Sequence, residues 1–178
     1  MNQEGQDVPR ALGRSRGDRA KVPKCGKATP KVPRSPAASS EATTKVMRAN
    51  KRKDTKPELL VRQHLREAGL TGYRLQWRVP GRPDVAWPGK KVALFVNGCF
   101  WHRCPHCQLP TPKSNVEYWV VKFERNKERD ERNIRALEEA GWKVHVLWEC
   151  QLKKRAIDQT FAELLPQLAD ELGKPLRG

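Results

Sequence analysis

The segment from residue 90 to residue 107 constrains this chain more than any other. It begins with a short and almost continuous apolar run at residues 92–96, which is the pattern of a strand buried on both faces. Gly98 ends the run, because a residue without a Cβ lets the backbone turn sharply. A loop at the end of a buried strand is where α/β enzymes often place their chemistry. We therefore expect the functional site to lie here. Three cysteines follow the glycine: Cys99, Cys104 and Cys107.

Helix and strand signals alternate on the N-terminal side of this segment. Thr55 to Glu58 has the form of a capping box with a proline in the first turn, and it predicts a helix that ends at Gly69. Strands are expected at residues 73–79 and directly after a turn at residues 80–84. The buried strand itself is expected at residues 91–97, after a hairpin-type turn at Pro88 and Gly89.

Helix and strand signals also alternate in the C-terminal half. Residues 114–117 form a second capping box, which predicts a long helix to Ala140 with Gly141 as its stop. An apolar strand is expected at residues 143–148. A last amphipathic helix is expected at residues 156–172, bent or broken at Pro166. The order of elements predicts an α/β fold, a mixed sheet flanked by helices.

The charge of the chain indicates a polyanionic partner. Lys and Arg number 36 against 20 Asp and Glu, a formal net charge of +16. Such an excess makes nucleic acid the first candidate, with a merely soluble basic surface as the alternative. Residues 1–43 hold almost no large apolar side chains, so we expect a disordered basic arm before a catalytic domain at residues 44–178. Cys25 lies in that arm and is expected to be a bystander thiol.

Neither a membrane-spanning segment nor an export signal is evident. No apolar run approaches the ~20 residues that cross a bilayer, and no apolar region follows the N-terminus. Cysteines in such a chain suit metal binding better than disulfides. We expect a structural zinc site with Cys150 as the fourth ligand, with the alternative that Cys150, distant in the sequence, is only a buried thiol. His106 competes with Cys107 for one position, and a redox pair or an empty thiol cluster is the alternative. The expected ligands are Cys99, Cys104, Cys107 and Cys150.

Oxygen and imidazole groups around the buried strand suggest a magnesium site. Asp84 lies at a strand end, where a carboxylate is a hard ligand suited to Mg²⁺, although a plain turn aspartate is the commoner case. The carbonyl groups of Val96 and Asn97 and the amide of Asn97 could complete the shell of the ion. His102 lies five residues further on as a candidate base.

Two other features bear on function. At helical spacing, Asp130 falls within an apolar stripe and so needs a partner, a histidine or arginine of the site, unless it reaches solvent or a lysine at the rim. Phe100 and Trp101 follow a ligand cysteine directly, where adjacent exposed rings suit insertion between base pairs. Ordinary core packing of one of the two is the alternative. The stripe consists of Trp119, Phe123, Ile134 and Leu137.

These motifs, in this order and spacing, resemble the very short patch repair endonucleases, which nick DNA beside a T:G mismatch. The resemblance covers about residues 44–152. It is carried by residues 47–49, 54–58, 80–84, 98–102, 112–115 with Trp119, 126–130, 141–144 and 148–150.

The resemblance implies a restriction-endonuclease-like fold with a structural zinc. Asp84 and the carbonyl of Val96 would hold Mg²⁺, and Glu58 would hold metal-bound water. His102 would be the base or proton shuttle, with its ring oriented by Asp130. Met47, Phe100 and Trp101 would form the wedge beside the mismatch, supported by Trp119.

This chain departs from the best-known members at Val96-Asn97, where they carry Thr-His. An amide can order a water but cannot relay a proton at neutral pH. Two alternatives therefore stand beside T:G nicking. They are a related, restriction-associated nicking enzyme of other specificity and a zinc-stabilised DNA-binding module with weakened catalysis.

The expected partner is double-stranded DNA with a T:G mismatch. Such mismatches arise by deamination of 5-methylcytosine, so a cytosine methyltransferase is the implied functional neighbour, and a mismatch-repair matchmaker is a further candidate. We expect a monomer in the prokaryotic cytoplasm, associated with the nucleoid and not with a membrane.

Overall fold

The computed structural model describes residues 34, 36, 40–49, 51 and 53–177, except the side chains of residues 43, 46 and 47. Its helices are α1 (Glu41–Ala49), α2 (Lys56–Glu67), α3 (Val116–Glu139) and α4 (Ile157–Leu172). Its strands are β1 (Val85–Trp87), β2 (Val92–Asn97) and β3 (Lys143–Trp148), with short 3-10 turns η1 (Pro88–Lys90) and η2 (Glu149–Leu152). The expected boundary between residues 43 and 44 falls inside α1. Most of the expected basic arm, including Cys25, lies outside the described residues, so the division into arm and domain stays a prediction.

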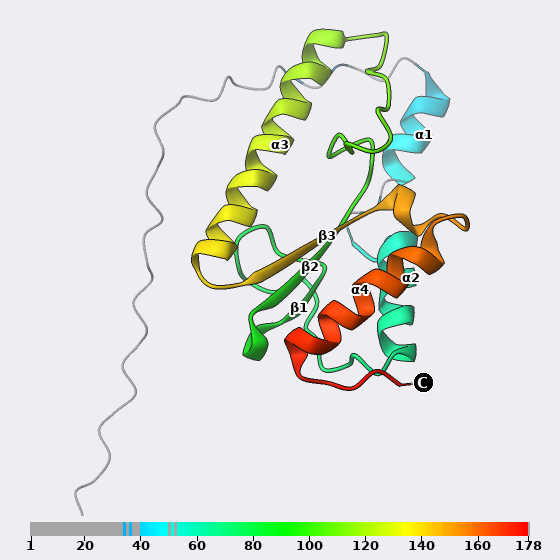
Figure 1. Ribbon diagram of the computed structural model, residues 1–178. Coiled ribbons are helices and arrows are strands. Elements are labelled where there is room, and N and C mark those ends of the chain that lie inside the picture. The colour runs from blue at the N-terminus through cyan, green and yellow to red at the C-terminus, as the bar shows by residue number, and fades with distance from the viewer. Residues whose placement is uncertain (1–33, 35, 37–39, 50, 52, 178) are drawn as a thin grey trace, which may run out of the picture.

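The described strands form a three-stranded sheet in the order β1-β2-β3 (Figure 1). β1 pairs antiparallel with β2, and the expected turn at Pro88 joins them through η1. β2 pairs in parallel with β3, from Val92 opposite Lys143 to Asn97 opposite Trp148. The long helix α3 makes the crossover that a parallel pair requires. The predicted mixed sheet with flanking helices is confirmed.

The core lies on one face of this sheet. Helices α2 and α4 cover that face, and α3 runs across the other (Figure 1). Alternate residues of β2 divide between the two sides: Val92 and Leu94 enter the main core cluster, whereas Phe95 faces α3. The helices contribute Val61, Leu65, Phe161, Leu164, Leu168 and Leu172 to the core cluster.

Helix α2 begins where the sequence predicts. Thr55 is its N-cap, with Oγ1 accepting a hydrogen bond from the Glu58 N–H at 3.4 Å, and Pro57 lies in the first turn. The Glu58 side chain accepts from the N–H of Asp54, one residue before the cap, at 2.9 Å. This cap fixes the position of Glu58 at the edge of the sheet.

The expected strand at residues 73–79 is wrong. Arg74 alone pairs there, through an isolated antiparallel bridge to Ala86, and the chain then leaves the sheet. Gln76 has a φ of +49°, which an extended strand cannot accommodate. The segment instead forms a loop that ends at Asp84.

Two helix predictions also need correction. The second capping box does not form: Asn115 caps α3 with a φ of +53° and without a side-chain hydrogen bond. Of the expected bend or break at Pro166, the break does not occur, because the last helix continues through the proline from Ile157 to Leu172. The buried Leu164 and Leu168 flank the proline, and their packing offsets the lost backbone hydrogen bond.

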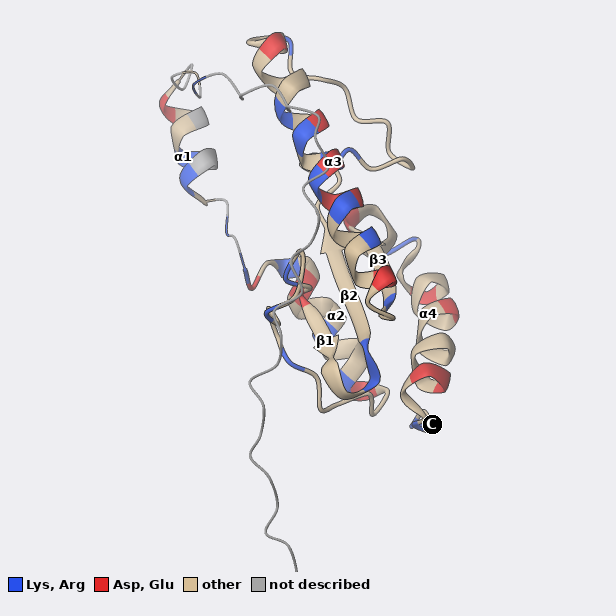
Figure 2. Ribbon diagram, turned by 90° about the vertical axis from the view of Figure 1, so that its left-hand side faces the viewer, with Lys and Arg blue, Asp and Glu red and all other residues tan. Residues whose placement is uncertain are grey.

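Charge is unevenly distributed over the helices (Figure 2). Lysines and arginines alternate with acidic residues along α3. By contrast, α4 carries four acidic residues, Asp158, Glu163, Asp170 and Glu171, and no Lys or Arg. Among the described residues, none of the helices is both long and apolar enough to cross a membrane.

Candidate active site

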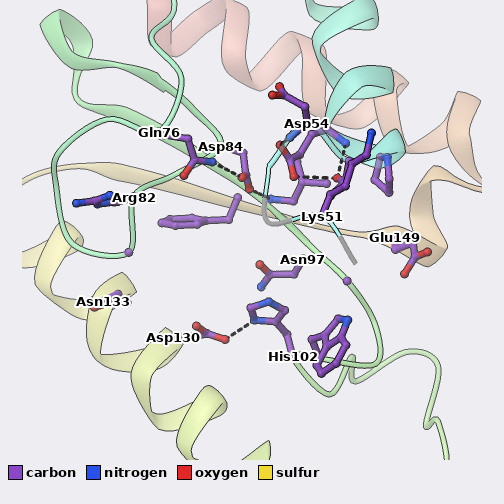
Figure 3. Close-up of a pocket in the computed structure, with 18 of the residues that line it drawn as sticks. Lys51, Asp54, Gln76, Arg82, Asp84, Asn97, His102, Asp130, Asn133 and Glu149 are labelled. Carbon is purple, nitrogen blue, oxygen red and sulfur yellow. Dashed lines mark hydrogen bonds and ion pairs between the residues drawn. The ribbon is translucent and has the colours of Figure 1, made fainter. Parts of the chain in front are cut away.

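A pocket of roughly 1190 Å³ opens at the carboxyl end of β2 (Figure 3). It lies between the first turn of α2, the loop before β1, the loop after β2 and the middle of α3. Several predicted site residues line it together: Glu58, Asp84, Val96, Asn97, His102 and Asp130. They come from four segments that are far apart in the sequence, so the fold brings them together.

Asp84 is held at both carboxylate oxygens. The backbone N–H of Val96 donates to Oδ2 at 2.7 Å, and the amide of Gln76 donates to Oδ1 at 2.9 Å. Burial raises the pKa of Asp84 to about 6, and the nearby charge of Glu58 adds to this. The hydrogen bonds from Val96 and Gln76 act in the opposite direction. Asp84 is therefore a fixed carboxylate in a poorly solvated place, where a cation is strongly favoured.

The carbonyl of Val96 points to the same side as Asp84. Within a strand, the N–H and C=O of one residue face the same edge. The N–H of Val96 is bound to Asp84, and Val96 lies two residues beyond the last pair of β1 with β2, Val85 and Leu94. Its carbonyl therefore faces the pocket edge without a strand partner.

His102 and Asp130 form a pair across the pocket from Asp84 (Figure 3). Nδ1 of His102 lies 2.5 Å from Oδ2 of Asp130. Arg129 donates to the other oxygen of Asp130 through Nη2 at 3.0 Å and Nε at 3.2 Å. Burial acts to raise the pKa of Asp130, but His102 and Arg129 outweigh it and hold the pKa below its usual value. Asp130 thus contacts both kinds of partner that were expected, a histidine and an arginine.

Glu58 is buried at the wall of the pocket. Its Oε1 accepts from the hydroxyl of Thr55 at 2.8 Å, and its Oε2 accepts from the N–H of Asp54. The buried Arg62 lies one turn further along α2, with Nη2 3.8 Å from Glu58 and 2.6 Å from Asp54. The guanidinium offsets the cost of burying the Glu58 carboxylate.

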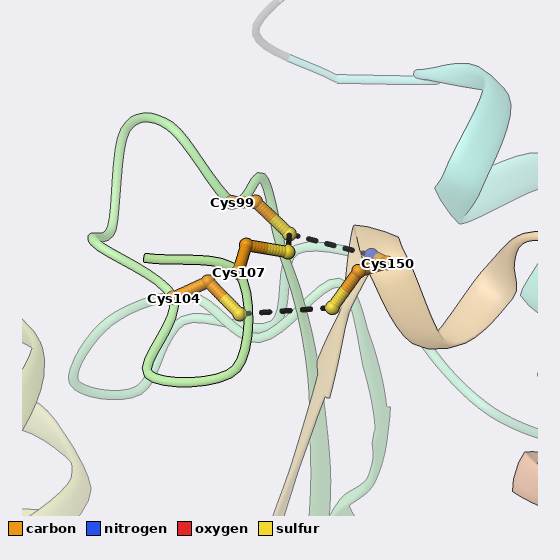
Figure 4. Close-up of side chains that lie close together, drawn as sticks. All are labelled: Cys99, Cys104, Cys107 and Cys150. Atoms are coloured by element: carbon orange, nitrogen blue, oxygen red, sulfur yellow. Dashed lines mark hydrogen bonds between the residues drawn. The ribbon is translucent and has the colours of Figure 1, made fainter. Parts of the chain in front are cut away.

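Four cysteine sulfurs meet beside the pocket (Figure 4). Sγ of Cys99 and Cys107 are 3.6 Å apart, as are those of Cys104 and Cys150, and all four lie within 4.8 Å of one another. A zinc ion bound at about 2.3 Å to four sulfurs sets edges of about 3.8 Å. The cluster therefore has the size of a closed four-cysteine metal site, and it could hold a metal such as zinc.

Backbone groups already favour negative charge on part of this cluster. Burial acts to raise the pKa of Cys104, but the N–H groups of His106 and Cys107 and the neighbouring thiols outweigh it, so that the pKa is lowered. Burial raises the pKa of Cys99 well above its usual value and that of Cys150 to about 11. His106 is exposed and contributes its backbone N–H, 3.4 Å from Cys104 Sγ. Cys107, not His106, lies in the cluster.

Phe100 and Trp101 are half-buried rather than exposed. They pack edge to face, with ring centres 5.1 Å apart, and Phe100 also contacts Phe123 of α3 at 5.2 Å. Trp119 lies 5.4 Å from Phe100 and 6.1 Å from Trp101. We call these four rings the aromatic cluster. The alternative of core packing thus applies in part to both rings. Trp119 contacts both of them, and its expected role on a DNA face stays a prediction.

The sequence interpretation missed two side chains that line the pocket, Gln76 and Arg129, and also Arg62, which lies behind Glu58. Gln76 has no recognisable motif, because its role depends on the turn that directs it at Asp84. Arg62 could have been found, since it lies four residues after Glu58 on the same helix face. Arg129 stands next to Asp130 in a motif already noted. Met47 lies in α1, but its side chain is outside the described residues, and its role stays a prediction.

Comparisons with known proteins agree on one family. The model of the DNA mismatch endonuclease Vsr family matches residues 38–109. The type II nicking enzyme V.XorIIP of Xanthomonas oryzae is 42% identical over 117 residues, which cover 64% of this chain and 84% of that protein. The DNA mismatch endonuclease Vsr of Escherichia coli is 41% identical over 106 residues, 55% of this chain and 67% of that protein.

A pocket of carboxylates and a histidine in a mixed α/β fold, together with these relatives, defines an endonuclease that acts on DNA. The chain belongs to the very short patch repair endonuclease family.

Proposed function

We propose that this protein nicks one DNA strand at T:G mismatches by Mg²⁺-dependent hydrolysis of a phosphodiester, in a restriction-endonuclease-like fold. The observation that carries the proposal is the convergence of Asp84, His102 and Asp130 on one pocket. Membership of the family supplies the substrate class, and the pocket supplies the groups that hydrolysis needs.

The oxygen groups at the end of β2 fit a magnesium ion. Mg²⁺ prefers hard oxygen ligands and keeps several waters. Asp84 and the carbonyl of Val96 would hold it, and Glu58 would bind one of its waters. When bound, the ion polarises the phosphate and stabilises developing negative charge. Asp84 suits this role because both its oxygens are oriented before any ion arrives.

His102 accepts the proton of the attacking water. With Nδ1 bound to Asp130, the Nδ1–H tautomer is favoured and Nε2 is left as the basic atom. Asp130 stabilises the imidazolium that results, and Arg129 keeps Asp130 ionised and in place. Asn97 can order a water by hydrogen bonding but takes no proton.

The aromatic cluster and the cysteine cluster have supporting roles. Phe100 and Trp101, with Met47, act as the wedge that opens the base stack, at a cost of roughly a few kcal/mol per step. Trp119 supports them from α3. Zinc held by the four cysteines pins the loop that carries Phe100, Trp101 and His102 to η2.

The biological setting follows from the substrate. T:G mismatches arise where 5-methylcytosine deaminates, so a DNA cytosine methyltransferase is the functional neighbour. A mismatch-repair matchmaker is a further proposed partner. The enzyme would act as a monomer in the prokaryotic cytoplasm, on the nucleoid.

A nicking assay tests the proposal. Labelled duplexes with T:G, matched T:A or an unrelated mismatch are incubated with the full-length protein in Mg²⁺ or in EDTA. We expect one nick, in the T:G duplex, with Mg²⁺ only. Asp84→Ala should abolish scission with duplex binding unchanged, and Asp130→Asn should lower the rate by about 10²-fold. Scission in EDTA would contradict the metal role.

The names of the relatives favour a second candidate. V.XorIIP and V.NmeAIP are both type II nicking enzymes. A restriction-associated nicking enzyme of other specificity is therefore the alternative, and it predicts nicking of the matched or the unrelated mismatched duplex in the same assay. Binding without any scission would instead support a DNA-binding module with weakened catalysis.

A further inference from the structure

The loop before β1 is rich in arginine, and its arginines have no role in the site described above. Residues 70–83 contain three arginines and no acidic residue. Arg74, Arg78 and Arg82 are all exposed, and in the described part of the chain none of them has a carboxylate partner. Leu75 is 44% exposed and Trp77 38% exposed in the same loop. Solvated arginines around exposed apolar groups are typical of a surface that binds nucleic acid.

The inner side of this loop is fixed at three points. Arg74 exchanges backbone hydrogen bonds with Ala86, at 2.7 and 2.9 Å. Gln76 donates to Asp84 inside the pocket. Gly81, with a φ of +75°, lies so close to Phe95 that a Cβ there would be 3.0 Å from the ring.

This anchoring orients the outer side chains before any ligand binds. Gln76 points into the pocket, while its neighbours Leu75 and Trp77 are exposed. The indole N–H of Trp77 has no acceptor among the described residues, so it is available to a ligand. A surface with its backbone already ordered loses less conformational entropy on binding than a flexible arm does.

We propose that residues 74–82 form a second DNA-contacting surface, which binds the sugar-phosphate backbone of the duplex on one side of the scissile phosphate. This inference rests on the proposed function, because it takes the pocket as the place of strand scission. The surface acts without reading sequence: the arginines neutralise phosphates, and Trp77 packs on a deoxyribose.

Its position relative to the pocket sets which part of the duplex it contacts. Gln76 and Arg82 lie on one side of the pocket, and His102 lies on the other (Figure 3). His102 belongs to the loop of Phe100 and Trp101. The aromatic cluster therefore contacts DNA on one side of the phosphate that enters the pocket, and the arginine surface contacts the opposite side.

A duplex is favoured over an acidic protein because the surface is continuous with the pocket. Gln76, Val79, Gly81 and Arg82 line the pocket wall, so a strand placed there must pass over this loop. An acidic protein bound to this loop would cover the pocket and exclude the DNA substrate.

Binding of the full-length protein to a labelled duplex, without Mg²⁺ and at several salt concentrations, tests this inference. Arg74→Gln and Arg78→Gln should each weaken binding by roughly fivefold to tenfold and reduce the slope of log affinity against log salt by about 0.9. Trp77→Ala should also weaken binding, and Trp77→Phe should restore most of it. Arg66→Gln is the matched control, because Arg66 is exposed near the far end of α2 and does not line the pocket. Thermal unfolding of each variant verifies its fold.

Duplexes shortened on either side of the mismatch test the placement. Shortening on one side only should remove the difference between the wild type and Arg78→Gln. Unchanged salt slopes in both arginine variants, or an effect that is independent of which side is shortened, would overturn the inference. A wild type that binds duplex but does not nick T:G would instead refute the proposed function, while the salt slopes would still decide the role of the loop.

Discussion

At the scale of single residues, Asp84 meets two opposing demands. In the proposed function it must be ionised to hold Mg²⁺, yet it lies where burial raises its pKa to about 6. Two donors, the N–H of Val96 and the amide of Gln76, offset part of that cost and fix both oxygens. The carboxylate is thus destabilising for the fold alone and favourable once a cation is bound, as is common where function and stability compete.

Asp84→Asn should stabilise the Mg²⁺-free protein at neutral pH. The folded pKa of about 6 exceeds the ordinary aspartate pKa of 3.8, so the folded state binds more protons than the unfolded state between these pH values. Wild-type stability therefore falls as pH rises from about 4 to 6, by up to about 3 kcal/mol. Asp84→Asn has no titratable group at this position, so its stability does not fall in this way. Urea unfolding at pH 4 and pH 8 measures the difference, and an equal effect at both pH values would contradict the prediction.

Gln76→Leu should weaken the response to Mg²⁺. Loss of the donor to Oδ1 removes one of the two hydrogen bonds that orient Asp84. Loss of such an outer partner typically costs about 10- to 100-fold in metal affinity or activity. Nicking rates over a Mg²⁺ titration at saturating DNA should show a higher half-saturating concentration. Gln63→Leu is the control, because Gln63 is exposed on α2 and bonds only Glu67. Equal Mg²⁺ dependence in both variants would mean that Gln76 has no positioning role.

At the scale of elements, the cysteine cluster ties two segments that no strand pairing joins. Cys99, Cys104 and Cys107 belong to the loop after β2, and Cys150 belongs to η2 after β3. The N–H of Cys99 also donates to Glu149 at 3.4 Å, and the N–H of Cys150 donates to Cys99 Sγ at 3.3 Å. The loop that carries His102 is therefore held from the end of β3.

Cys150→Ser should release bound zinc and lower the melting temperature, because a structural zinc site contributes directly to folding free energy. His106→Ala should leave both unchanged, since His106 is exposed and offers the cluster only its backbone N–H. Zinc content by atomic absorption and thermal unfolding of both variants provide the measurement. Zinc loss in His106→Ala would assign that histidine as a ligand in place of a cysteine.

At the scale of the whole molecule, charge is unevenly distributed among the elements. The loop at the pocket carries three exposed arginines, whereas α4 on the other face of the sheet carries four carboxylates and no Lys or Arg (Figure 2). Exposed arginines beside the pocket favour a polyanionic ligand there.

The N-terminal segment adds positive charge to the chain. Residues 1–33 contain eight Lys and Arg against three Asp and Glu. Their deletion should lower duplex affinity and reduce its salt dependence, with the nicking rate at saturating DNA unchanged. Binding at several salt concentrations and single-turnover nicking provide the test. A lower rate at saturation would mean that the segment acts in the pocket.

Much of the element order follows from local signals in the sequence. Thr55 and Pro57 predict the start of α2, the apolar run predicts β2, and Gly141 follows the end of α3 as expected, because capping and burial patterns depend on near neighbours. A histidine or arginine partner for Asp130 was also predicted, since an acidic residue in an apolar stripe must find a partner, and His102 and Arg129 both contact it.

Other features depended on contacts between distant parts of the chain. The sequence of residues 73–79 suits a strand, but Gln76 turns inward to Asp84 and the rest of the segment loses its strand partner. Pro166 is tolerated because leucines on both sides are buried against the sheet. The sequence alone thus determined the residue types of the site and much of the order of helices and strands. The tertiary structure decided which way each side chain of the pocket points, because that depends on packing between segments that meet only after folding.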